Sequence, residues 1–157
     1  MRRRILLLAL AAALVPGLAA CGEEGGEEGG GELPAEEFAS RADALCDSFA
    51  KENRRPPEPD NAKQAGRFAK EEADQRVRLQ EQLTDIGPPD GAKADFDTYA
   101  EQTQQIIELF EDQVIAAEKG DSERFSASFA EIDTLTAERA QTAERLGFQT
   151  CGQPGLL

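Results

Sequence analysis

Apolar residues recur at intervals of three and four along most of the chain, and the most regular example lies between residues 96 and 119. Because an α-helix completes a turn in about 3.6 residues, such spacing places the side chains on one face. Lys119 followed by Gly120 is a typical signal for the end of a helix. The pattern predicts a helix with Phe110 at the centre of its buried face. The stripe consists of Phe96, Tyr99, Thr103, Ile106, Phe110, Val114 and Ala117.

Three further segments have the same period, and Pro-rich or Gly-rich residues separate them. The first begins at Leu33-Pro34 and runs to Arg54-Arg55, the second runs from a cap at Asp60 or Asn61 to about Ile86, and the last runs from a cap at Asp121 or Ser122 to Gly147. No stretch alternates as a half-buried strand would. We therefore expect an all-α fold: an antiparallel up-down-up-down four-helix bundle whose first and last helices are adjacent.

The phenylalanines follow this helical pattern. Seven of the eight lie inside the four segments, and Phe148 follows the last one. In the last segment, Phe125 and Phe129 continue a stripe through Ile132 to Leu146. Such spacing favours a place in the core over a ligand-binding cluster.

The second segment is less regular, because its apolar residues form no single seam. It contains two i,i+4 pairs with the acidic residue first, Glu72–Arg76 and Asp74–Arg78. This order is favourable on a helix surface. We expect both pairs on a solvated face.

The first 21 residues have a different pattern. Arg2-Arg3-Arg4 precede an apolar run from Ile5 to Val15, which is far shorter than the roughly 20 residues needed to span a bilayer. This layout is typical of an export signal. The motif that follows, Leu18-Ala19-Ala20-Cys21, resembles the lipobox of bacterial lipoproteins. That resemblance implies removal of residues 1–20 and a lipid on Cys21, which would anchor the protein on the extracytoplasmic face of the cell membrane.

An ordinary signal peptide, cut after Ala20, is the alternative. Leu18 is large for a position three residues before such a cut, and Cys21 would then be an exported free thiol. Both points favour lipidation.

Residues 22–32 contain only glycine and glutamate. Such a composition gives a flexible, self-repelling spacer, and it lacks the Asp-x-Asp-x-Asp-Gly pattern of a calcium loop. The sequence therefore predicts three parts: a signal peptide over residues 1–20, a lipidated cysteine with its tether over 21–32, and a helical bundle domain over 33–157.

The charge of the chain excludes one class of partner. The sequence has 17 basic and 31 acidic residues, a net charge of −14. Removing the leader, with its three arginines and no acidic residue, changes the charge to −17. So acidic a chain is repelled by phosphate backbones and by anionic headgroups. We expect no binding to nucleic acid.

Two cysteines remain once Cys21 is assigned to the lipid. In an exported protein, the pair Cys46 and Cys151 favours a disulfide over two separate buried thiols, and the expected bundle brings their helices together. A zinc site would need four ligands with local spacing, whereas the chain offers two distant sulfurs and no histidine. The sequence predicts a Cys46–Cys151 disulfide and no metal or other cofactor.

The whole layout also resembles small helical lipoproteins of high-GC actinobacteria. The features that carry this similarity are the lipobox, the tether, Ala42-Asp43-Ala44-Leu45-Cys46, Gly87-Pro88-Pro89 and the stretch from Leu146 to Gly152. That family has no assigned reaction. The resemblance implies a location and a disulfide but no activity.

No arrangement of residues in the sequence indicates catalysis. Histidine is absent, so neither an ordinary triad nor the Glu-x-x-His repeat of di-metal bundles can form. We expect a non-catalytic binding or adaptor module that presents a surface to another envelope protein or to a small apolar ligand. The alternative is a structural or stress-related acidic surface lipoprotein without a specific ligand. A groove or an exposed apolar patch would favour the first hypothesis.

Overall fold

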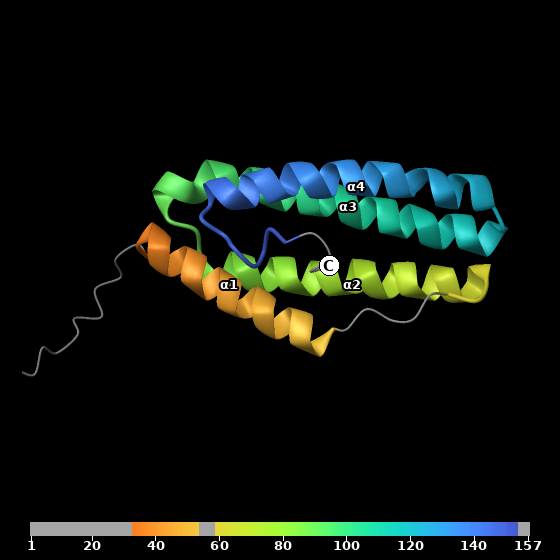
Figure 1. The fold of residues 1–157 in the computed structure, drawn as a ribbon, viewed down its shortest axis with the longest axis horizontal. Coiled ribbons are helices and arrows are strands. Elements are labelled where there is room, and N and C mark those ends of the chain that lie inside the picture. Colours follow the sequence, from red (N-terminus) through yellow and green to blue (C-terminus); the bar gives the residue numbers. More distant parts are fainter. Residues whose placement is uncertain (1–32, 54–58, 154–157) are drawn as a thin grey trace, which may run out of the picture. The chain divides into compact units, whose positions relative to one another are not determined.

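The computed structural model describes residues 33–53 and 59–153. They form α1 (Ala35–Glu52), α2 (Ala62–Ile86), the short 3-10 helix η1 (Asp90–Ala92), α3 (Lys93–Lys119) and α4 (Ser122–Arg145). This part of the chain contains no strand. Helices that follow one another in sequence pack together in antiparallel order, α1 on α2, α2 on α3 and α3 on α4 (Figure 1). The predicted all-α bundle is confirmed, while the predicted signal peptide and tether lie outside the described residues.

The helix ends follow local capping chemistry. The side chain of Asn61 accepts a hydrogen bond from the backbone N–H of Gln64 at 3.0 Å, and Asp121 caps α4 through Arg124 at the same distance. These bonds satisfy N–H groups that have no partner within a helix's first turn. At the other end of α3, Gly120 has a φ of 70°, a left-handed conformation that glycine adopts without steric cost.

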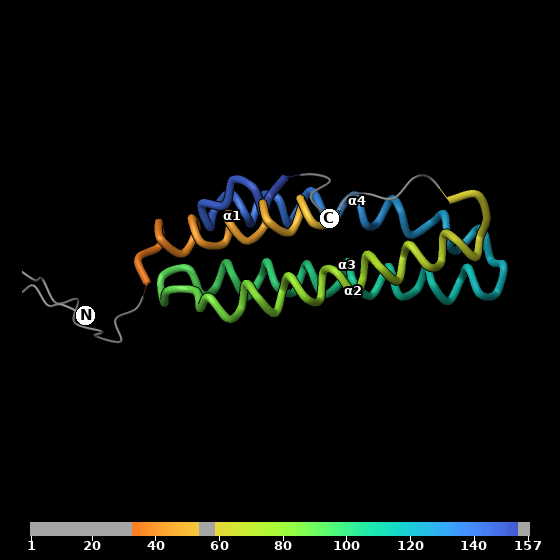
Figure 2. The backbone as a smooth tube through the Cα atoms, turned by 90° about the horizontal axis from the view of Figure 1, so that it is seen from below, coloured from red at the N-terminus to blue at the C-terminus, as the bar shows by residue number. Residues whose placement is uncertain are grey.

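The first helix is shorter than its neighbour. α1 has 18 residues and α2 has 25, so their lengths are about 27 Å and about 37 Å. As a result α1 covers only part of α2 (Figure 2).

The core is divided into two clusters. The first core cluster lies where α1 is present and includes four aromatic rings whose centroids are 5.6 to 6.5 Å apart. Rings at such separations pack favourably beyond the area that they bury. This cluster consists of Phe38, Ala39, Ala42, Cys46, Phe49, Leu79, Leu83, Phe96, Tyr99, Ala143, Leu146, Phe148 and Cys151.

The second core cluster is built by α2, α3 and α4 alone. Phe110 is buried in it, as its position on the most regular stripe predicts. The cluster consists of Ala69, Ala73, Ile106, Ile107, Phe110 and Ile132.

Two expectations require correction. Phe129 is 48% exposed and Phe125 is half-buried, so the stripe of α4 is not covered along its whole length. The physical reason is that α1 is too short to lie beside the second core cluster, so only three helices surround that cluster. In addition, α1 does not pack along α4 as neighbouring helices do; it contacts α2 and the segment after α4, residues 146–153.

Candidate functional site

The predicted cysteine pair is joined. The Cys46 and Cys151 sulfurs are bonded, their Cα atoms are 5.4 Å apart, and both residues are fully buried. A bridge without solvent access is poorly placed for thiol–disulfide exchange, because exchange requires attack by a thiolate. The disulfide therefore acts as a structural link between α1 and the segment 146–153.

Asp43, one turn before Cys46, holds the same segment. Its carboxylate accepts hydrogen bonds from the backbone N–H groups of Gln149, Thr150 and Cys151, at 2.8, 2.7 and 3.0 Å. The N–H groups of residues 146–148 still donate to carbonyls of α4, whereas those of residues 149–151 lie beyond the helix and need acceptors outside it. Asp43 lies within the stretch Ala42–Cys46, but the sequence did not predict this role for it. The available signal was a carboxylate one helical turn from a cysteine expected to bond to that segment.

Two arginines are buried in the bundle, contrary to the expectation from the sequence. Arg76 is 2% exposed, although the pair Glu72–Arg76 was expected on a solvated face. The ion pair does form, at 2.5 Å, and the Arg76 guanidinium lies 4.4 Å from the centroid of the Phe110 ring. The spacing predicted the pair but not its burial. The other expected pair is replaced, since Asp74 bonds Lys70 at 2.7 Å.

Arg139 on α4 is equally buried, with 2% of its surface exposed. Its guanidinium lies 5.4 Å from the centroid of the Tyr99 ring, and the Tyr99 hydroxyl donates to the carbonyl of Cys151 at 3.3 Å. Burial raises the pKa of Tyr99, and the positive charges of Arg139 and Arg76 partly oppose that rise. Tyr99 therefore stays a neutral donor that links α3 to the segment 146–153.

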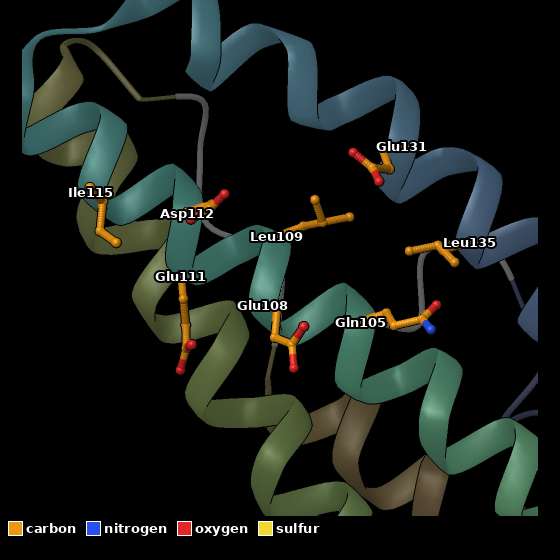
Figure 3. Close-up of a pocket in the computed structure, with 8 residues that line it drawn as sticks. All are labelled: Gln105, Glu108, Leu109, Glu111, Asp112, Ile115, Glu131 and Leu135. Carbon is orange, nitrogen blue, oxygen red and sulfur yellow. The ribbon is translucent and has the colours of Figure 1, made fainter.

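A surface groove lies between α3 and α4 (Figure 3). We call it the acidic groove. Its volume is about 480 Å³, and it is lined by Gln105, Glu108, Leu109, Glu111, Asp112, Ile115, Glu131 and Leu135. Leu109 and Leu135 point toward each other across it, and Ile115 is 39% exposed. The groove thus combines three apolar side chains with four carboxylates.

One cation already borders the acidic groove. Arg124 on α4 donates to Asp112 on α3 at 2.9 Å, and this hydrogen bond raises the pKa of the Arg124 guanidinium. The pair ties the two helices together across an exposed surface. Within the described ranges, no group of three or more potential ligand side chains is arranged to hold a metal ion.

The structure brings together two of the three predicted site residues, Cys46 and Cys151, whereas Cys21 lies outside the described residues. Among the helices described, none has a stretch long and apolar enough to cross a membrane. Comparison of the chain with family models, with curated proteins and with solved structures gives no match.

Proposed function

We propose that this protein is a lipid-anchored, extracytoplasmic lipoprotein whose helical domain is a non-catalytic binding or adaptor module of the cell envelope. The leader and its motif at residues 18–21 support the anchor. The buried disulfide supports an oxidising compartment, where such bonds persist.

The observation that carries the binding role is the acidic groove. A purely structural acidic module would be expected to be polar all round, but here the exposed Ile115 and the partly buried Leu109 and Leu135 line one groove together with carboxylates from two helices. Apolar contact supplies affinity when it is removed from water, and complementary charge steers association and sets the register. The partner that fits is a basic, amphipathic segment of an envelope protein.

A labelled peptide with lysine and leucine at helical spacing tests this role by fluorescence anisotropy against the purified full chain. Reversing two carboxylates of the groove, Glu108→Lys with Glu131→Lys, should weaken binding about tenfold, which corresponds to ~1.4 kcal/mol. That loss is the sum expected for two partly exposed charge pairs.

The control makes the same change of net charge elsewhere, on exposed positions of α2, Glu81→Lys with Asp85→Lys. It separates binding in the groove from general attraction to an acidic protein. Equal weakening by both pairs of substitutions would reject the groove as the binding surface.

The anchor has its own test. Cys21→Ser should leave an unprocessed or soluble form, because stable membrane attachment needs the acyl chains. If the variant has the parent's mass and partitions with membranes as the parent does, the assignment of Cys21 as the lipid-bearing residue is wrong.

A further inference from the structure

Charge is distributed unevenly along the acidic groove. Asp112 is already neutralised, because the Arg124 guanidinium donates to its carboxylate at 2.9 Å. Glu108, Glu111 and Glu131 form no ion pair in the part of the chain that the structure describes. A segment lying in the groove therefore meets net negative charge beside the glutamates and a cation beside Asp112.

The groove has two distinct ends. Figure 3 shows Asp112 and Ile115 toward one end and Gln105 toward the other, with Leu109 and Leu135 facing each other between them. Gln105 and Ile115 are ten residues apart on α3, which corresponds to about 15 Å along the helix axis. This length fits about three turns of a partner helix, with apolar side chains of the partner on the two leucines.

The cation lies at one of these ends. Asp112 is in the last two turns of α3 and Arg124 is in the first turn of α4, so their ion pair lies near the loop that joins the two helices. At the opposite end Gln105 is uncharged. The two directions in which a helix could lie in the groove are therefore electrostatically different.

We propose that the partner is an amphipathic helix, basic at its centre and acidic at one end, and that Arg124 determines which way it lies. This inference rests on the proposed function of the groove. The basic residues of the partner lie beside Glu108 and Glu131, and its acidic residue lies beside Arg124. A guanidinium has five N–H donors, and the described hydrogen bond to Asp112 uses one of them. Arg124 can therefore bond a second carboxylate without releasing Asp112.

The overall charge of the chain disfavours a second copy as the occupant. The net charge of −14 would bring like charges together along the groove. A basic residue at the acidic end of the partner helix is disfavoured for a similar reason, since it would meet the Arg124 cation. Charge complementarity thus selects both the partner and its direction.

Two labelled peptides of equal length test this direction by fluorescence anisotropy against the purified full chain. Both carry leucine and lysine at helical spacing. One has glutamate about two helical turns from its central lysine, and the other has lysine at that position. Arg124→Glu should change the ratio of the two dissociation constants about fivefold, in favour of the lysine-ended peptide, because it reverses one partly exposed charge contact.

Arg145→Glu is the matched control. Arg145 also joins α4 to α3, through Asp95 at 2.8 Å, and its side chain is 51% exposed against 49% for Arg124. The two arginines are 21 residues apart, about 31 Å along α4. Both variants have the same net charge, so the control should keep the ratio of the unaltered chain. Circular dichroism shows that each variant is folded.

The outcomes separate this inference from the proposed function. If Glu108→Lys with Glu131→Lys weakens binding but Arg124→Glu leaves the ratio unchanged, the groove binds the peptide and Arg124 does not set its direction. Equal changes of the ratio in Arg124→Glu and Arg145→Glu would assign the preference to overall charge and reject the role of Arg124. Absence of binding by both peptides would reject the proposed function and this inference with it. Self-association that the peptides inhibit would assign the groove to a second copy of the chain.

Discussion

The two core clusters share α2, α3 and α4 but differ in what covers them. At the first core cluster, α1 and the segment 146–153 add a further layer, and Phe38, Cys46 and Cys151 are fully buried. At the second core cluster no described helix adds that layer, and Phe129, on the same helix as Ile132 of this cluster, is nearly half exposed. Whether an apolar side chain of this bundle is buried therefore depends on how far α1 and the segment 146–153 extend, and not only on the apolar stripes of the other helices.

The covering layer is itself weakly attached. α1 packs on α2 much less extensively than α2 packs on α3. Two links compensate for this, the disulfide and the hydrogen bonds of Asp43, and both join α1 to the segment 146–153. The first core cluster thus depends on a covalent bond, whereas the second depends on helix packing.

The largest expected effect comes from removing that bond. Cys151→Ser should lower the free energy of unfolding by up to about 4–5 kcal/mol, because the bridge closes a loop of 105 residues in the unfolded chain. Urea unfolding measures this loss. Limited proteolysis should cut α1 before α2, α3 and α4, since α1 has the fewest other contacts.

Labelling of free thiols in the native, non-reduced protein is the accompanying control. Full labelling of both Cys46 and Cys151 would contradict the bridge. Cutting of all four helices at the same rate in the Cys151→Ser variant would contradict the separate role of α1.

A pair of phenylalanines compares burial with exposure near the second core cluster. Phe110→Ala should lower the free energy of unfolding by about 3–5 kcal/mol, because it leaves a cavity under the guanidinium of Arg76. Phe129→Ala should cost less than about 1 kcal/mol, as exposed substitutions usually do. Chemical denaturation of both variants measures the difference. Equal losses would mean that Phe129 is buried in solution.

The helices themselves could be predicted from the sequence because their causes are local. The period of 3.6, the caps at Asn61 and Asp121, and Gly120 all act within a few residues, and the structure uses each of them. The disulfide was predictable from the expectation of export together with the two cysteines left after Cys21. The exposure of Phe129 was not, because it depends on the length of another helix.

The burial of the two arginines, Arg76 and Arg139, could not be predicted from the sequence either. An i,i+4 spacing predicts the Glu72–Arg76 pair on either face of α2, so it says nothing of burial. Arg139 is preceded by Glu138 and lies among other polar residues, a context that suggests solvent. The acidic groove could not be predicted from the sequence either, because Leu109 and Leu135 belong to different helices and come together only when α3 packs on α4.

The smallest expected effect separates the hydrogen bonds of Asp43 from the disulfide. Asp43→Asn keeps the size of the side chain and the Cys46–Cys151 bond but removes the charge and one acceptor oxygen. Hydrogen bonds to a charged group contribute about 1.5–3 kcal/mol each, and asparagine retains one oxygen, so we expect a loss of roughly 1–2 kcal/mol. Amide hydrogen exchange should become faster at Gln149, Thr150 and Cys151, the three donors to this carboxylate, while amides of the second core cluster keep their protection. Faster exchange in the second core cluster as well would show that the two clusters unfold together. Unchanged exchange at the three donors would show that the disulfide alone holds the segment.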